Sequence, residues 1–179
     1  MPTRAELEAA RARVLDDVLA PGLRVLFCGI NPGLYTAWAG HHFARPGNRF
    51  WPALHLSGFT PRLLHASEQP QLLELGLGVT NLVARTTARA DELTAAELEA
   101  GARALRGKLR LYRPRWLAML GTGAYRTAFQ RPRATVGEQP DLLEGTRVWV
   151  LPNPSGLNAH YQLPALVEQF EKLRRAAGT

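Results

Sequence analysis

Four short, mainly apolar segments rich in β-branched and aromatic residues stand out along the chain. Each is only five residues long and carries apolar side chains at neighbouring positions rather than only at every second one. Apolar runs of this length are typical of strands that are buried on both faces. The pattern therefore predicts four buried strands, which cover residues 24–28, 78–82, 116–120 and 147–151.

Helical periodicity marks two longer segments. The first begins with Thr94 and Glu97, whose spacing is that of a capping box, and continues with apolar residues three or four positions apart: Leu98, Ala102, Leu105, Leu109 and Tyr112. The second places charged residues opposite a face formed by Leu163, Leu166, Val167, Phe170 and Leu173. Both segments are predicted to be amphipathic helices that cover a sheet.

Strands that alternate with helical segments favour right-handed crossovers and a parallel sheet. The sequence therefore predicts a three-layer α/β/α sandwich with a central, mainly parallel four-stranded sheet. No internal repeat or linker interrupts the chain, so residues 1–179 are expected to form a single domain. Ligands of such sheets bind at the carboxyl ends of the strands, so functional residues are expected in the loops that follow the strands.

The charge balance narrows the choice of partner. The chain has 22 Lys and Arg residues against 15 Asp and Glu residues, which gives a net charge of +7. This excess favours polyanionic partners such as nucleic acid. Only Lys108 and Lys172 are lysines, so biased codon usage is an alternative explanation of the arginine excess.

The single cysteine, Cys28, excludes an intrachain disulfide and a cysteine-based metal cluster. The adjacent His41 and His42 lack a third matched ligand, so we expect no metal site. No apolar stretch has the length of a membrane span or the character of a signal peptide. We therefore expect a soluble, cytoplasmic protein.

Two of the predicted strands run directly into loops with unusual sets of side chains. The first strand is followed by Gly29-Ile30-Asn31-Pro32-Gly33 and a loop rich in aromatic, His and Gly residues, and the last strand by Asn153-Pro154-Ser155-Gly156-Leu157-Asn158. Glycine lets the backbone approach a ligand, proline fixes the direction of the chain, and asparagine offers neutral donors and acceptors. Taken alone, each loop also fits an ordinary turn after a strand.

Together with Arg49-Phe50-Trp51 and residues 78–83, these loops closely resemble the motifs of the mismatch-specific uracil-DNA and thymine-DNA glycosylase family of the uracil-DNA glycosylase superfamily. The resemblance extends from about Leu19 to the last predicted helix. It implies an enzyme that flips uracil out of duplex DNA and hydrolyses the N-glycosidic bond with water, leaving an abasic site, without metal or cofactor. Catalysis would then come mainly from positioning the water and stabilising the departing base.

The resemblance assigns roles to the first loop. Asn31 would hold the water through its side-chain carbonyl group. Phe43 would stack on the flipped base, although packing in the core is the alternative role for this ring, and the main-chain amides around Ile30 and Phe43 would donate to the base. The two residues after Leu34 would decide by steric exclusion whether a ring methyl is accepted. The predicted base-binding set is Ile30, Gly33, Tyr35, Thr36 and Phe43.

The second loop is expected to contact the DNA. Leu157 resembles the apolar wedge that fills the space left by the extruded nucleotide, and an exposed leucine between Gly and Asn is otherwise unexpected. Main-chain groups of Gly156 and Asn158 would face the unpaired partner base. Asn153 and Ser155 would lie at the minor groove and the adjacent phosphate.

Position 159 departs from the family pattern. Relatives commonly carry an arginine there, whereas this chain has Ala159 followed by His160. One contact to DNA is therefore expected to be lost or moved, with consequences for discrimination of the base opposite the lesion.

Asp91 offers a second route to water activation, because it lies beside arginines in residues 85–92, which follow the second strand. Some glycosylases of the wider superfamily use an aspartate for this purpose, and a carboxylate is a much stronger base than an amide. The alternative is that Asp91 and Glu92 are solvated residues before the helix that Thr94 introduces, where the helix dipole favours acidic side chains. The candidate catalytic residues are therefore Asn31 and Asp91.

The sequence as a whole predicts a monomeric, nucleoid-associated glycosylase that acts on double-stranded DNA, on uracil opposite guanine first and on ethenocytosine or thymine second. One alternative is a nucleic-acid-binding protein of the same fold without catalytic activity, but the retention of Asn31 and Phe43 argues against it. Another is a hydrolase of free nucleosides, in which Leu157 would have no duplex to enter.

Overall fold

The computed structural model describes all 179 residues and contains one five-stranded sheet, with the strands in the order β2-β1-β3-β5-β4. The strands are β1 (Val25–Gly29), β2 (Leu77–Asn81), β3 (Trp116–Leu120), β4 (Gly137–Glu138) and β5 (Arg147–Leu151). All pairs are parallel except that of β4 with β5. The loops after β1, β2 and β5 therefore start from the same edge of the sheet.

The predicted number of strands differs from the observed number by one. The four expected strands are present within one residue of their predicted bounds, whereas β4 was not expected. β4 has two residues and pairs only with Val150 and Trp149 of β5. So short an edge strand leaves no hydrophobic pattern in the sequence, because its position is set by the strand beside it and not by its own side chains.

Successive residues of the central strands point into two separate cores. In β1, Val25 and Phe27 belong to one core, and Leu26 and Cys28 to the other, as the two-residue period of a strand requires. Cys28 is fully buried, and burial raises the pKa of its thiol to about 12 because it disfavours the thiolate. The apolar runs in the sequence thus reflect a sheet that is covered on both faces.

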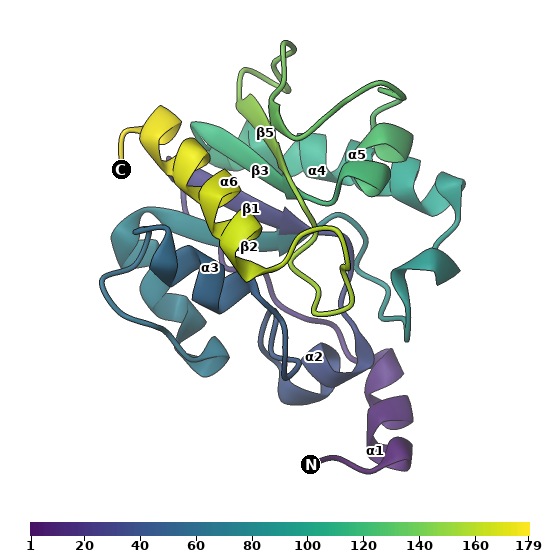
Figure 1. Ribbon diagram of the computed structural model, residues 1–179. Helices are drawn as coiled ribbons and strands as arrows, with labels where there is room; N and C mark the ends of the chain where they lie inside the picture. The colour runs from purple at the N-terminus through teal and green to yellow at the C-terminus, as the bar shows by residue number, and fades with distance from the viewer.

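Helices cover both faces of the sheet (Figure 1). One core packs beneath α3 (Phe50–Leu56), the 3-10 helix η2 (Ala66–Leu75) and α6 (Leu163–Ala177), and the other beneath α4 (Ala95–Tyr112) and α5 (Thr122–Ala128). α3 and α6 also contact each other. This arrangement confirms the predicted three-layer α/β/α sandwich with a mainly parallel central sheet.

Both predicted amphipathic helices are present, as α4 and α6. The hydroxyl of Thr94 accepts from the main-chain amide of Glu97 at 3.1 Å, and the Glu97 carboxylate accepts from the amide of Thr94 at 2.8 Å. These two bonds form the expected capping box. α6 ends at Ala177, and the residue that caps it, Gly178, adopts the left-handed conformation common at helix ends.

Short helical segments lie beyond the carboxyl end of the sheet. α1 (Arg4–Ala9) and the 3-10 helix η1 (Ala10–Ala12) pack against α2 (Leu34–Ala39), which follows β1, and the 3-10 turn η3 (Ala90–Glu92) follows β2 (Figure 1). α1, α2 and η3 contribute residues to the wall of one cavity. None of the helices combines the length and the apolar composition needed to cross a bilayer.

Gly101 in α4 packs against the segment that leaves β2. A Cβ atom at Gly101 would lie 2.3 Å from the carbonyl oxygen of Leu82, whereas a Cβ at Gly107 of the same helix would meet open space. We expect Gly101→Ala to lower the free energy of unfolding by about 1–3 kcal/mol, because backbone atoms cannot move aside cheaply. Gly107→Ala should raise it by about 0.5–1 kcal/mol, because alanine favours the helix. Urea unfolding measures both changes, and changes of the same sign would contradict this packing.

Candidate active site

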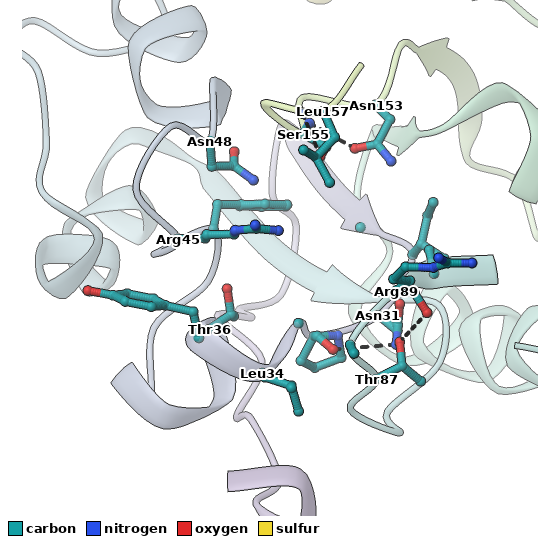
Figure 2. A pocket seen from close by; sticks show the side chains of 18 of the residues that line it. Asn31, Leu34, Thr36, Arg45, Asn48, Thr87, Arg89, Asn153, Ser155 and Leu157 are labelled. Carbon is teal, nitrogen blue, oxygen red and sulfur yellow. Dashed lines mark hydrogen bonds between the residues drawn. The ribbon is translucent and has the colours of Figure 1, made fainter. Parts of the chain in front are cut away.

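A cavity of about 760 Å³ lies at the carboxyl end of the sheet, between the loops that follow β1, β2 and β5 (Figure 2). Asn31 and Leu157, from the two loops that the sequence singled out, both border it. Gly156 and Asn158 do not border the cavity but belong to the same loop as Leu157. The other predicted site residues all line it: Ile30, Asn31, Gly33, Tyr35, Thr36, Phe43, Asp91, Asn153, Ser155 and Leu157.

Gly29 ends β1 at the floor of this cavity. A Cβ atom there would lie 2.7 Å from Oδ1 of Asn81 and 3.3 Å from Cζ of Phe43. Any side chain at this position would therefore displace either the amide of Asn81 or the ring of Phe43. Glycine at this position leaves room for two cavity side chains that meet above its backbone.

The side-chain amide of Asn31 has one defined orientation. Its Nδ2 donates to the carbonyl oxygen of Arg85 and to Oγ1 of Thr87, both at 2.8 Å, and more weakly to the carbonyl oxygen of Pro32 at 3.4 Å. Because a main-chain carbonyl can only accept, the nitrogen must face Arg85. Oδ1 of Asn31 accepts no hydrogen bond from the protein and is free to accept one from a ligand.

Thr87 stabilises this orientation. Its hydroxyl donates to the carbonyl oxygen of Arg89 at 2.7 Å, so the lone pair of Oγ1 is what remains for the Asn31 amide. The main-chain amide of Thr87 also donates to the carbonyl oxygen of Pro32 at 3.1 Å. Thr87 is buried, with 1% of its surface exposed. It was not among the predicted site residues, because the 56 residues that separate it from Asn31 leave no local pattern.

Phe43 lies partly in the core and partly at the cavity. Its ring stacks on Phe50 with the centroids 4.1 Å apart, and it packs against the core of that face of the sheet. The same ring lines the cavity. The φ angle of Phe43 is 54°, in the left-handed region that non-glycine residues seldom adopt and that costs free energy. The strained backbone and the Phe50 contact hold an aromatic ring in place at the cavity wall.

Two main-chain amides at the cavity, those of Ile30 and Phe43, donate to no acceptor within the protein. Such groups are available to carbonyl oxygens of a ligand. Near them Thr36 is buried and Tyr35 is half-buried, and both line the cavity together with Gly33. The residues that carry these amides and side chains therefore border the same space.

Asp91 lies at the edge of the cavity in an ion pair. Nε and Nη2 of Arg89 donate to its two carboxylate oxygens at 3.0 and 2.7 Å. The hydrogen bonds from Arg89 lower the pKa of Asp91, which keeps the carboxylate ionised and makes it a weaker base. Both side chains are well exposed, at 66% for Asp91 and 74% for Arg89. This is the environment of a solvated surface pair.

The loop after β5 is held by its own side chains. Oδ1 of Asn153 accepts from the amide of Ser155 at 3.0 Å, and Oγ of Ser155 accepts from the amide of Leu157 at 3.2 Å (Figure 2). These bonds close a tight turn whose tip is Leu157, 74% of which is exposed. Asn153 and Ser155, predicted to contact DNA, therefore also shape the turn that presents the leucine.

The main-chain groups predicted to face the unpaired base are partly occupied. The carbonyl oxygens of Gly156 and Asn158 both accept from the guanidinium group of Arg49, and the amide of Asn158 donates to the carbonyl oxygen of Ser155. The amide of Gly156 has no acceptor in the protein. Among the main-chain groups of Gly156 and Asn158, the amide of Gly156 is therefore the one that makes no hydrogen bond within the protein.

Asn81 is a further polar residue at the cavity for which the sequence suggested no role. It ends β2 beside Gly29 of β1, and its Nδ2 lies 3.5 Å from Nδ1 of His42. Nε2 of His42 lies 2.8 Å from the carbonyl oxygen of Asp16, so the proton belongs on Nε2 and Nδ1 accepts. Burial lowers the pKa of His42 and keeps the ring neutral. Asn81 could have been identified from the sequence, because it lies at the end of a predicted strand whose neighbour in the sheet carries the first motif.

Comparisons with known proteins identify the family of this chain. Residues 17–176 match the family model of the uracil DNA glycosylase superfamily. The fold is also similar to the solution NMR structure of a protein from Methanosarcina acetivorans described as a "putative uracil DNA glycosylase". The two share 18% sequence identity with a TM-score of 0.61, over 93% of this chain and 98% of that chain. Because the family model covers most of the chain, including both loops at the cavity, this protein belongs to the uracil DNA glycosylase superfamily.

Proposed function

We propose that this protein is a monofunctional DNA glycosylase of the mismatch-specific uracil-DNA and thymine-DNA glycosylase branch, which flips uracil out of duplex DNA and hydrolyses its N-glycosidic bond. One observation carries the proposal: the unpaired Oδ1 of Asn31 and the exposed side chain of Leu157 border the same cavity. The first can hold a water molecule, and the second can replace a nucleotide in the base stack.

In the proposed reaction, Oδ1 of Asn31 accepts a hydrogen bond from the attacking water and thereby directs an oxygen lone pair toward C1′ of the deoxyribose. The C1′–N bond breaks and its electron pair leaves with the base. The water oxygen bonds to C1′ of the resulting oxocarbenium-like sugar, and the released proton finally neutralises the base anion. An amide cannot remove a proton in the transition state, so its contribution is the placement of the water.

Stabilisation of the departing base supplies the rest of the catalysis. The negative charge of a uracil anion resides largely on its carbonyl oxygens, which the free amides of Ile30 and Phe43 can bind. The ring of Phe43 offers a surface on which the base stacks. The amide of Asn81 presents one donor and one acceptor, a pair that matches the polar edge of uracil.

The substrate range that we propose is based on the same cavity. Uracil opposite guanine is the principal substrate that we propose, with ethenocytosine and thymine as secondary bases. The cavity of about 760 Å³ is of the size that holds drug-sized ligands, so its volume also accommodates the fused ring of ethenocytosine. Tyr35 and Thr36 are the side chains that we expect to limit access of a ring methyl. A monomer acting on nucleoid DNA is sufficient for this chemistry.

Substitutions of Asn31 and Asp91 test which of the two residues positions or activates the water molecule. We expect Asn31→Ala to lower the single-turnover rate of uracil release from a G·U duplex by roughly 100-fold or more, because the water loses its fixed position. Asp91→Asn should change the rate less than twofold, because the carboxylate is exposed and already paired with Arg89. The opposite order of effects would assign water activation to Asp91. Duplex binding by the wild type without any uracil release would leave only the non-catalytic alternative.

Thr87 provides an isosteric test of how the Asn31 amide is oriented. Thr87→Val keeps the shape of the side chain but removes the acceptor for Nδ2, so we expect the single-turnover rate to fall roughly tenfold while duplex affinity is retained. Thr87→Ser keeps the hydroxyl and should recover most of the rate. Equal losses in the two variants would show that packing, and not the hydrogen bond, matters at this position.

Leu157 should matter only where there is a base stack to enter. We expect Leu157→Ala to lower the ratio of duplex to single-strand uracil release roughly tenfold, because most of the apolar area that replaces the flipped base is removed. The assay uses one uracil-containing oligonucleotide, with and without its complementary strand. An unchanged ratio would remove the wedge from the mechanism and would favour the hydrolase of free nucleosides, which a parallel assay with deoxyuridine can detect.

A further inference from the structure

Arg49 ends the loop that follows β1, and its side chain contacts the loop that follows β5. Its guanidinium group contacts five acceptors in residues 155–162, which connect β5 to α6. Nη1 lies 2.9 Å from the carbonyl oxygen of Asn158, 3.0 Å from that of Tyr161 and 3.3 Å from that of Ser155. Nη2 lies 3.2 Å from the carbonyl oxygen of Gly156 and 3.1 Å from Oε1 of Gln162. No carboxylate pairs with Arg49, so all the acceptors that its guanidinium group has within the protein are neutral carbonyl oxygens.

These carbonyl groups need such a partner. The chain between Leu151 and Leu163 has no helix or strand of its own. Its turn brings four main-chain oxygens toward one point, where their partial negative charges repel one another. A guanidinium group has several donors in a fixed plane, which suits it to bridging converging oxygens. Removal of Arg49 would leave the carbonyl groups of Asn158 and Tyr161, two half-buried residues, without a donor and would free the turn to open.

The backbone of Arg49 contacts the same loop. Its amide donates to the carbonyl oxygen of Pro154 at 2.8 Å. A Cβ atom at Gly156 would lie only 2.6 Å from the carbonyl oxygen of Gly47, so the two loops touch, main chain against main chain. The turn that carries Leu157 is therefore docked on residues 47–49 and is not free in solvent.

The next residue, Phe50, connects this contact to the base pocket. Phe50 stacks on Phe43, the aromatic ring at the cavity wall, with the centroids 4.1 Å apart. Arg49 itself precedes α3, which begins at Phe50 and is packed into the core. Two consecutive residues thus hold the wedge turn on one side and the base-stacking ring on the other, both fixed to the same helix.

We propose that Arg49 is a positioning residue that fixes the wedge turn relative to the base-stacking ring, so that insertion of Leu157 and seating of the flipped base occur together. The inference rests on the proposed glycosylase function. It assigns no chemical step to Arg49, which reaches the reaction only through the loop that it holds. Its effect should consequently appear on duplex DNA, where a base must be displaced, far more than on single strands.

Variants of Arg49 test this role against a matched control. We expect Arg49→Met to lower uracil release from a G·U duplex roughly tenfold more than release from the same oligonucleotide as a single strand, because charge-assisted hydrogen bonds that order the wedge are lost. Arg49→Lys should give an intermediate ratio, because an ammonium group reaches fewer of the oxygens. If both rates fall by the same factor in Arg49→Met, the proposal is overturned.

Arg174 serves as the control because it makes the same kind of contact elsewhere. Its Nε donates to the carbonyl oxygen of Ser57 at 2.7 Å and its Nη1 to that of Thr179 at 2.6 Å, away from the cavity. Arg174→Met should therefore lower thermal stability but leave the ratio of duplex to single-strand release at the wild-type value. A ratio that falls equally in this variant would mean that general destabilisation, and not the wedge turn, controls it.

Amide hydrogen exchange of the free protein separates failure of this proposal from failure of the proposed function. We expect faster exchange in residues 155–162 of Arg49→Met than in the wild type, and wild-type exchange there in Arg174→Met. Unchanged exchange in Arg49→Met would overturn the ordering role even in an active enzyme. A wild-type protein that releases no uracil from either substrate would overturn the proposed function and, with it, the role of Arg49 in base flipping.

Discussion

The hydrogen bond from Nδ2 of Asn31 to the carbonyl oxygen of Arg85 determines which atom of the Asn31 amide can face a ligand. An asparagine side chain can turn either its oxygen or its nitrogen toward a ligand, and only the oxygen can direct the lone pair of a water molecule at an electrophilic carbon. Arg85 and Thr87 lie in the chain that leaves β2, so this strand supplies the orientation of a residue that follows β1. The water-holding role proposed for the first loop thus depends on the parallel pairing of two strands.

The loops after β1 and β5 also depend on each other for their positions. The first contributes the aromatic ring and the amides, the second contributes the exposed leucine, and the contact between them runs through residues 47–49 and 154–156. The proposed base flipping requires a wedge and a pocket at a set distance, because insertion without a seat for the base gains nothing. A rigid helix that contacts both loops meets this requirement better than two independently mobile loops would.

Residues that follow a strand could be located from the sequence, whereas residues that act across the fold could not. Asn31 and Leu157 are recognisable because each sits in a short motif directly after an apolar run, and a parallel sheet brings such positions together. Thr87 and Arg49 contact their partners across 56 and more than 100 residues, and no local pattern encodes these contacts. β4 was missed for the same reason, since β5 determines where it pairs. Hydrophobic periodicity predicts the layers of the fold. The residues that orient a site, in contrast, depend on tertiary contacts between segments far apart in the sequence.

The charge around Asn31 explains what kind of catalyst this site can be. Its amide is surrounded by carbonyl and hydroxyl groups, and the nearby carboxylate of Asp91 is neutralised by Arg89 and has a lowered pKa. In the proposed reaction, which has no strong base, the water attacks only after the glycosidic bond has largely broken, so the rate would depend on how well the base carries a negative charge as it leaves. Uracil-type bases with electron-withdrawing carbonyl groups meet this condition better than intact cytosine does. Under the proposed mechanism, selectivity therefore arises from the chemistry of the leaving group as well as from the shape of the cavity.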